Sequence, residues 1–395
     1  MGLNQTPKGE RLHIALFGKR NAGKSSLVNA ITGQELSIVS EQKGTTTDPV
    51  YKAMEWLPLG PVMLVDTPGL DDIGQVGALR IKKTREVLRK TDLAILVTTT
   101  EQKCLDPVEL ELEQELKERK IPYVIVCNKA DLGEGFCHEN VVFISAKTGY
   151  GIEELKETIP KLLPKEKGHP LVSDLIEKED LVVLVVPIDK SAPKGRLILP
   201  QQQVIRDILE KGGIPVVVRD TELEAVFPLL AKTPKMVITD SQVFEKVSKI
   251  VPDEVQLTSF SILMARYKGN LKALAENASV LDRLQNGDKI LMAEGCTHHR
   301  QCEDIGTVKI PNWIREYTGK DIVIETSSGT GFPEDLSEYA LIVHCGACML
   351  NAREMKYRMA EAERQGIPMV NYGIAIAYMN GIVQRSLQMF ENKKE

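Results

Sequence analysis

Short apolar runs alternate with amphipathic stretches along the whole chain, and this alternation predicts strands that are separated by helices. In the first part of the chain the runs that predict strands are residues 12–17, 62–65, 93–98, 123–127 and 141–144. Strands that alternate with helices in this way are typical of α/β proteins with parallel sheets. A helix after Gly151 that ends near Leu163 is expected to close this first unit.

The same alternation continues behind a polar stretch, residues 164–170, whose prolines, glycine and charges predict a linker. The predicted strands of the middle part are residues 181–188, 214–219 and 235–239, and its predicted helices are 201–211, 241–250 and 259–267. In the last part the predicted strands are residues 289–293, 321–325, 340–344 and 369–372. We therefore expect three α/β domains with mainly parallel sheets, spanning residues 1–166, 171–268 and 269–395.

A glycine-rich motif follows the first predicted strand. Residues 18–25 fit the pattern G-x-x-x-x-G-K-[ST], and the apolar periodicity of residues 26–31 predicts that a helix follows. In this context the backbone N–H groups and the helix N-terminus bind phosphates. We expect Lys24 to reach the β- and γ-phosphates and the Ser25 hydroxyl to ligate Mg²⁺. The residues expected at the phosphates are Gly18, Asn21, Ala22, Gly23, Lys24, Ser25, Ser26 and Gly69.

Three more motifs end predicted strands and specify the nucleotide. Asp66 opens an Asp-Thr-Pro-Gly motif, where its carboxylate can hold Mg²⁺ and the Gly69 amide can meet the γ-phosphate. Asp131 ends an Asn-Lys-Ala-Asp motif, and its carboxylate can accept two N–H bonds that guanine supplies and adenine does not. The residues expected around the base are Asn128, Lys129, Asp131, Ser145, Ala146 and Lys147. Together the motifs predict a GTP-binding P-loop GTPase domain, and the polar loop 44–48 offers a threonine for Mg²⁺.

Composition narrows the class of protein further. The net charge is −5 and the charges are well mixed, so no basic stripe indicates nucleic-acid binding. No apolar run approaches the ~20 residues that cross a bilayer. The first residues are polar and lack the core of a signal peptide, so we expect a cytoplasmic protein that does not bind membranes.

The cysteines form the second chemical signal. Their number, seven, is odd and disfavours a disulfide framework in a chain without a secretion signal. Cys296 and His298 follow one predicted strand, and His344, Cys345 and Cys348 follow another, so all are expected at the same edge of a parallel sheet. Three thiolates with a Cys-x-x-Cys pair suit either an iron–sulfur cluster or a zinc ion completed by a histidine. Inert buried thiols are the remaining alternative.

The GTPase motifs resemble those of the TrmE-Era-Septin-like GTPases, especially the tRNA-modifying TrmE branch. This resemblance implies that Thr46, the second threonine after Gly44, ligates Mg²⁺ and that Asn21 coordinates an activating K⁺. Leu70 stands where Ras-like proteins carry a water-positioning glutamine. The resemblance thus implies slow, K⁺-dependent hydrolysis of GTP to GDP that works as a switch.

The whole chain resembles the HydF family, the maturation GTPase and scaffold of [FeFe]-hydrogenase, because a TrmE-like GTPase region and a middle α/β region precede Cys-x-His and His-Cys-x-x-Cys. This resemblance implies a [4Fe–4S] cluster on Cys296, Cys345 and Cys348, with His298 and His344 as candidates for the fourth ligand or for a diiron site. Glu294 or Asp304 are further candidates for that ligand.

The same resemblance implies a homodimer formed through the middle domain. It also implies that the chain receives or assembles a diiron precursor with CO and cyanide ligands from radical-SAM hydrogenase maturases. The chain would then transfer this precursor to apo-[FeFe]-hydrogenase.

The residues leave two other interpretations open. An RNA-modification or ribosome-assembly GTPase with a structural zinc site would be colourless and would bind RNA with a steep salt dependence. The acidic balance of the chain counts against this interpretation. A regulatory last domain without metal would carry no stoichiometric metal after anaerobic purification.

Overall fold

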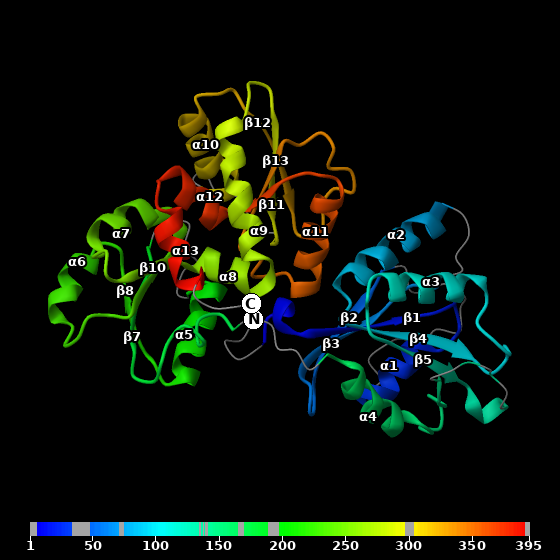
Figure 1. Ribbon diagram of the computed structural model, residues 1–395. Helices are drawn as coiled ribbons and strands as arrows, with labels where there is room; N and C mark the ends of the chain where they lie inside the picture. The colour runs from blue at the N-terminus through cyan, green and yellow to red at the C-terminus, as the bar shows by residue number, and fades with distance from the viewer. Residues whose placement is uncertain are drawn as a thin grey trace. The chain divides into compact units, whose positions relative to one another are not determined.

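The computed structural model describes residues 6–33, 48–70, 75–133, 136, 138, 141–164, 170–188, 197–296 and 304–391, with the backbone alone for residues 75–82. The chain forms two compact units, Met1–Glu166 and Lys167–Glu395 (Figure 1). The predicted linker 164–170 lies largely outside the described residues, since residues 165–169 are not among them.

The first unit is built on one six-stranded sheet in the order β2-β3-β1-β4-β5-β6. Its strands are β1 (Leu12–Phe17), β2 (Val50–Trp56), β3 (Gly60–Asp66), β4 (Leu93–Thr99), β5 (Tyr123–Asn128) and β6 (Val141–Phe143). Its helices are α1 (Lys24–Thr32), α2 (Gln75–Lys90), α3 (Pro107–Glu118) and α4 (Ile152–Leu162), with short 3₁₀ turns η1 (Lys8–Glu10) and η2 (Ala130–Leu132). All neighbouring strands are parallel except β2, which runs antiparallel to β3.

Helices cover both faces of this sheet. Ile14 and Leu16 of β1 pack with α1 and α4 on one face, whereas Ala15 and Phe17 pack with α2 and α3 on the other (Figure 1). Because both faces are buried, the central strands are continuous apolar runs, as parallel strands in α/β proteins usually are. The carboxyl ends of β1, β3 and β5 all lie at one edge of the sheet, where the three phosphate and guanine motifs begin.

The second unit holds two four-stranded parallel sheets, in the orders β10-β9-β7-β8 and β12-β11-β13-β14. The strands of the first of these sheets are β7 (Leu181–Val185), β8 (Ile214–Val218), β9 (Met236–Thr239) and β10 (Gln256–Ser259). Those of the second are β11 (Lys289–Glu294), β12 (Val323–Ser328), β13 (Leu341–His344) and β14 (Met369–Asn371).

The helices of the second unit lie around these two sheets. They are α5 (Leu199–Lys211), α6 (Leu223–Val226), α7 (Phe244–Ile250), α8 (Phe260–Lys268), α9 (Leu271–Glu276), α10 (Ile310–Thr318), α11 (Ala352–Arg364), α12 (Tyr372–Met379) and α13 (Val383–Glu391). Shorter helical turns are η3 (Phe227–Leu229), η4 (Ser241–Val243), η5 (Asn277–Arg283) and η6 (Ile305–Lys309). One hydrophobic cluster contains residues of both sheets, and the last helix, α13, packs against β10 (Figure 1). The division of this unit into domains 171–268 and 269–395 stays a prediction.

The predicted fold class is confirmed, and the differences from the predicted elements have local causes. Strands β2 and β10 were not predicted: β2 is an edge strand with mostly exposed side chains, and β10 contains a single apolar residue, Leu257. Asp240 caps the turn η4 by accepting from the Gln242 N–H, so the helix predicted from residue 241 begins only with α7. Asn371 likewise accepts from the Gly373 N–H, and Tyr372 therefore starts α12 instead of ending β14.

Within the part of the chain that the structure describes, we find no helix with the length and apolar character that spanning a bilayer requires.

Candidate functional site

The glycine-rich motif forms a loop between β1 and α1. Gly23 has a φ of 92°, a left-handed conformation that favours glycine, immediately before the first residue of α1. Lys24 is buried, and its ammonium donates to the carbonyl oxygens of Gly18 at 2.8 Å and Lys19 at 2.7 Å. The loop thus wraps around the lysine ammonium, which is the arrangement that a phosphate loop uses to bring a positive charge to phosphates.

Asp66 at the end of β3 faces Ser25 at the start of α1. The Ser25 hydroxyl donates to Asp66 Oδ2 at 2.5 Å, while the buried Oδ1 atom has no hydrogen-bond partner among the described residues. Burial raises the pKa of the Asp66 carboxyl, and the Ser25 hydrogen bond and the charges of Lys24 and Lys52 act in the opposite direction. A buried carboxylate with one unpartnered oxygen beside a serine hydroxyl fits the Mg²⁺ position of a P-loop GTPase.

Asn128 connects the phosphate loop to the loop that is expected to cover the base. Its side-chain amide donates to the Ala22 carbonyl at 2.9 Å, and its Oδ1 atom accepts from the Ala146 N–H at 3.0 Å. A Cβ atom on Gly23 would clash with the same amide nitrogen. One buried asparagine therefore holds three separate sequence motifs in register.

These motifs line an open pocket of about 620 Å³, a size typical of small-molecule sites. It is lined by Asn21, Gly23, Ser26, Asn29, Ala30, Gly33, Asn128, Lys129, Asp131, Leu132, Ser145, Ala146 and Lys147. Asp131 is exposed, and a hydrogen bond from the Ser145 side chain is the main cause that lowers the pKa of its carboxyl. The Asp131 carboxylate is therefore ionised and accessible, as an acceptor for guanine N–H groups must be.

The neighbourhood of the γ-phosphate is described only in part. Thr46 and the rest of residues 34–47 lie outside the described residues. The Leu70 N–H donates to the Gly18 carbonyl at 3.3 Å, and the Leu70 side chain packs against the hydrophobic core. Gly69 is thus held next to the phosphate loop, and the position after it presents no polar side chain to orient a water molecule.

The second candidate site lies at the edge of the third sheet. Strands β11 and β13 are neighbours and pair Ala293 with His344, so the residues that follow them emerge side by side. Cys296 follows β11, whereas Cys345 and Cys348 follow β13. The pair β11 and β13 is also the point where the strand order of this sheet reverses, which is where open α/β sheets bind ligands.

The sulfur of Cys345 accepts two backbone hydrogen bonds, from Gly295 N–H at 3.1 Å and from Ala347 N–H at 3.4 Å. Burial, and then the charges of Cys345 and Cys348, raise the pKa of the Cys296 thiol to about 12. The three thiols are thus close enough to interact electrically, and a cationic group would convert them to thiolates. This donor chemistry fits an iron–sulfur cluster. Among the described residues no group of three or more His, Cys, Asp and Glu side chains is arranged to hold a metal ion.

His344 is completely buried, and both of its ring nitrogens have partners. Nδ1 lies 2.8 Å from the Cys345 carbonyl oxygen, and Nε2 lies 3.1 Å from Arg358 Nη1. Because a guanidinium can only donate, Nε2 accepts, and the proton on Nδ1 is donated to the carbonyl. Burial, assisted by the Arg358 charge, lowers the pKa of His344 to about 3. A bond from either nitrogen to iron would first require one of these hydrogen bonds to break.

Oxygen atoms gather near the same thiols. A Cβ atom on Gly306 would clash with both Glu294 Oε1 and the Tyr372 hydroxyl, so these two oxygens flank one glycine. The Tyr372 hydroxyl is buried without a hydrogen-bond partner among the described residues. Burial raises the pKa of Tyr372 well above its ordinary value, and the charges of Cys345, Glu294 and Asp304 add to this effect. Tyr372 was not predicted as a site residue, although its place after β14 follows the same strand-end rule.

Three residues near the predicted site, His298, His299 and Cys302, lie outside the described residues. Asp304, the first residue described after them, accepts hydrogen bonds from the Gly306 and Thr307 N–H groups and thereby begins η6.

Comparison with protein families divides the chain into three matched stretches. Residues 13–129 match the model of the 50S ribosome-binding GTPase family. Residues 171–269 match the hydrogen maturase F dimerization domain, and residues 272–389 match the hydrogen maturase F tetramerization domain.

Similar proteins each match less than half of the chain. The tRNA modification GTPase MnmE of Aquifex aeolicus is 34% identical over 158 residues, which cover 38% of this chain and 34% of that protein. MnmE of Dichelobacter nodosus is 36% identical over 183 residues, which cover 43% of this chain and 40% of that protein. The chain therefore spans well under half of the length of these relatives. A crystal structure of Era from Aquifex aeolicus with GDP and AlF₄⁻ aligns at 19% identity and a TM-score of 0.35, covering 55% of this chain and 98% of that one.

The two hydrogen maturase F domains together cover more than half of the 395 residues and follow a GTPase domain that carries a phosphate loop. The chain belongs to the hydrogen maturase F family of GTPases.

Proposed function

We propose that this protein is a GTP-hydrolysing scaffold that carries an iron–sulfur cluster during the maturation of [FeFe]-hydrogenase. The observation that carries the proposal is the placement of three cysteines behind two paired parallel strands, in a chain with both hydrogen maturase F domains. The GTPase part is supported by the pocket that the phosphate-loop and guanine motifs line.

In the GTPase domain, Lys24 and the backbone of residues 18–26 would hold the phosphates of GTP or GDP, and Asp131 would bind guanine. Ser25, Asp66 and Thr46 would hold Mg²⁺, which supplies charge compensation for the transferred phosphoryl group. Support comes from the Ser25–Asp66 contact and from the unpartnered Asp66 oxygen.

We further propose K⁺ as the activator of hydrolysis, with Asn21 as a ligand. Asn21 is exposed, and its φ of 60° places this residue in the left-handed region that non-glycine residues rarely adopt. Such backbone strain is often found at functional sites. With Leu70 packed into the core, no side chain at the glutamine position of Ras-like proteins is available to orient water.

In the third sheet, Cys296, Cys345 and Cys348 would be the thiolate ligands of a [4Fe–4S] cluster. When bound, the cluster supplies an iron with an exchangeable ligand position beside which a diiron unit can attach. Residues of this chain prepare the site: Gly295 and Ala347 donate N–H bonds to the Cys345 sulfur, which favours its thiolate. His298 and His344 remain candidates for the fourth ligand or for the diiron site, and His344 would have to give up one of its present partners.

The cargo would be a diiron precursor with CO and cyanide ligands, received from radical-SAM hydrogenase maturases and passed to apo-[FeFe]-hydrogenase. The protein would act as a homodimer or a larger assembly, which is supported by its dimerization and tetramerization domains. GTP binding would gate the exchange of partners by ordering loops near the γ-phosphate.

The decisive experiment measures iron, sulfide and zinc in anaerobically reconstituted protein, together with visible and EPR spectra. We expect about four irons per chain, the content of a cubane cluster. Cys345→Ser should remove the iron and leave GTP hydrolysis unchanged. Cys104→Ser, which alters an exposed cysteine of the other unit, is the matched control and should keep the iron. Iron retained by Cys345→Ser would contradict the proposal.

The same measurement also decides the second candidate, a GTPase in RNA modification or ribosome assembly. The match of residues 13–129 to a 50S ribosome-binding GTPase model and the similarity of the chain to tRNA modification GTPases favour this candidate. Stoichiometric zinc without iron, together with salt-dependent RNA binding, would establish it instead.

A further inference from the structure

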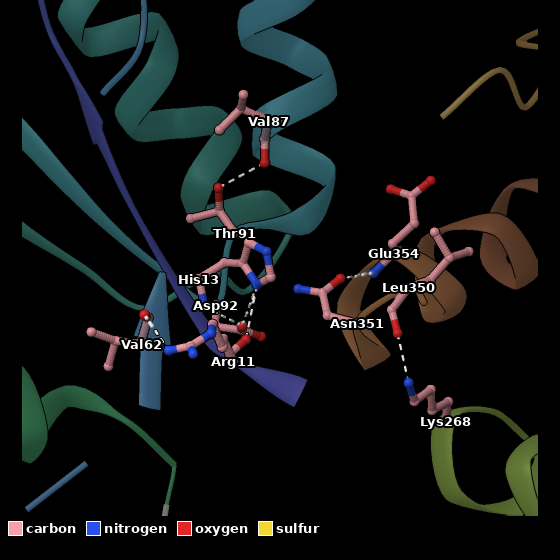
Figure 2. A network of polar contacts seen from close by, with 10 residues as sticks. All are labelled: Arg11, His13, Val62, Val87, Thr91, Asp92, Lys268, Leu350, Asn351 and Glu354. Atoms are coloured by element: carbon pink, nitrogen blue, oxygen red, sulfur yellow. Dashed lines mark hydrogen bonds and ion pairs between the residues drawn. The ribbon is translucent and has the colours of Figure 1, made fainter. Parts of the chain in front are cut away.

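Lys268 is the last residue of α8, and its side chain is buried with 1% exposure. Its ammonium donates to the carbonyl oxygens of Ala347 at 3.2 Å, Cys348 at 3.3 Å and Leu350 at 2.7 Å; Figure 2 shows the Leu350 bond. An ammonium has three protons, so each of these three carbonyls can accept one of them. A lysine from the stretch that matches the dimerization domain thus holds the loop that carries two of the three cysteines.

The loop directs its carbonyl and N–H groups to opposite sides. Ala347 has a φ of 53°, a left-handed conformation that is uncommon for a residue with a Cβ atom. In this conformation the Ala347 carbonyl accepts from Lys268 while its N–H donates to the Cys345 sulfur. The negative ends of the peptide dipoles therefore face the ammonium, and positive ends face the cysteine sulfur. Without the ammonium, the loop loses the group that offsets the strain at Ala347.

Helix α8 supports the loop along one face. Ser261, Met264 and Lys268 recur at helical spacing. A Cβ atom on Gly346 would lie 3.4 Å from Met264 Cβ and 3.6 Å from Ser261 Oγ, so these residues adjoin the loop. The cysteine loop consequently lies on a helix of the preceding sheet.

The charge at this position has a high energetic cost that packing alone does not explain. Removing an ammonium from water remains costly even after the surroundings relax. Apolar side chains can fill buried space on a helix without that cost, and lysine is almost never fully buried unless it is paired. A positive charge that lies behind a thiolate loop offsets the negative charge of ligated cysteines. It also favours the addition of an electron to a bound cluster, since nearby charge and hydrogen bonds set cluster potentials.

We propose that Lys268 is a positioning residue for the cysteine loop and that its charge raises the reduction potential of the bound cluster. The second half of this proposal rests on the proposed cluster. The first half concerns the loop itself and is tested without iron.

The first test uses full-length protein without iron and measures alkylation of Cys345 by iodoacetamide, followed by peptide mass spectrometry. Lys268→Met should open the loop and break the two N–H bonds to the sulfur. Because the loss of these bonds also lowers the thiolate fraction, the rate is expressed per thiolate from its pH dependence, and this rate should rise at least tenfold. Lys272→Met, the same charge change at an exposed residue of α9, should leave the rate within twofold of the unaltered protein. An equal rate in Lys268→Met would overturn the positioning role.

The second test uses reconstituted protein and an EPR-monitored redox titration. Lys268→Met should lower the reduced-to-oxidised ratio of the cluster about tenfold at a given potential, which is about 59 mV for one electron. Lys268→Arg should keep the ratio within threefold, and Lys272→Met should not change it. If Lys268→Met does not fold, Lys268→Gln removes the charge and keeps two N–H donors.

The outcomes separate the two proposals. If the cluster potential of Lys268→Met shifts no more than that of Lys272→Met, the role of the charge is overturned, while the presence of the cluster is unaffected. Unaltered protein that binds no iron would defeat the proposed function and with it the role of the charge, whereas the alkylation rates would still decide the positioning role.

Discussion

Replacing Arg358 with methionine should destabilise the second unit more than any change at its surface. The Arg358 side chain is completely buried. Its Nε donates to Glu354 Oε1 at 2.9 Å and its Nη2 to the Gly329 carbonyl at 2.5 Å, while Nη1 lies 3.1 Å from His344 Nε2. The guanidinium also stands 5.0 Å from the centre of the Phe332 ring. Methionine is unbranched like arginine and fills most of this space, but it donates no hydrogen bond.

The size of the destabilisation follows from the Glu354 carboxylate, which methionine at position 358 leaves buried without its ion-pair partner. The Glu354 side chain is 3% exposed, and its Oε2 atom has no hydrogen-bond partner among the described residues. Its backbone N–H donates to Asn351 Oδ1 at the start of α11 (Figure 2). Removing one member of a buried ion pair costs about 3–5 kcal/mol, because the other charge stays buried and unpaired. The unpaired Glu354 charge alone should therefore lower the free energy of unfolding of this unit by about 4 kcal/mol.

A double variant separates the charge from the other contacts. Arg358→Met combined with Glu354→Met removes both charges, and replacement of a buried pair by apolar residues is often neutral. The Gly329 carbonyl and the His344 ring still lose a donor, at about 1–3 kcal/mol for each unsatisfied group. Both variants share these losses, so the double variant should be more stable than Arg358→Met alone by about 3–5 kcal/mol, the cost of the unpaired charge.

The assay uses the two tryptophans of the chain, which lie in different units. In a Trp56→Phe background, the fluorescence of Trp313 reports urea unfolding of the second unit alone. Arg364→Met is the matched control: Arg364 lies on the same helix and its side chain is 69% exposed in an ion pair with Glu361. Such a surface pair contributes about 0–1 kcal/mol. A loss for Arg358→Met no larger than that of Arg364→Met would refute the reasoning.

Three further changes test other parts of the structure. Asn128→Ala should weaken binding of a fluorescent GDP analogue by at least tenfold, because it breaks both bonds between the phosphate loop and the base loop; unchanged affinity would contradict this. Burial lowers the pKa of His13, which lies beside Arg11 and Asp92 (Figure 2), to about 4. The unfolded state therefore binds more protons between pH 6.5 and 4. We expect the free energy of unfolding of the first unit to fall by about 3 kcal/mol as the pH falls from 6.5 to 4. Urea unfolding followed by Trp56 fluorescence in a Trp313→Phe background measures it, and His13→Leu should make this free energy nearly independent of pH over the same range. Gly295→Ala would bring a Cβ atom to 2.9 Å from Leu350 Cγ and should displace the cysteine loop, so the iron content of reconstituted protein should fall. An iron content equal to that of the unaltered protein would contradict this prediction.

Most of the fold and the positions of both candidate sites could be predicted because their signals are local. The phosphate loop needs a strand, a glycine-rich turn and a helix in sequence, and all three lie within residues 12–32. The cysteine motifs follow predicted strands, and the carboxyl ends of parallel strands share one edge. Strand β2 escaped prediction because its exposed side chains carry little apolar signal and its pairing is set by β3.

The residues that support the cysteine loop could not be predicted in the same way, because their contacts are made with residues far away in the sequence. A lysine at the end of a helix is ordinary, since it favours the negative end of the helix dipole, and nothing local distinguishes Lys268 from an exposed residue. Its partners lie about 80 residues further on. The predicted boundary between the middle and last domains, 268/269, falls directly behind this lysine. A cut there would separate the cysteine loop from the three hydrogen bonds that Lys268 donates to it. It would also remove the core residue Ile262, which packs in the same hydrophobic cluster as β11 and β13. The middle stretch therefore forms part of the support of the cysteine site, and changes in α8 have a direct structural route to the thiols.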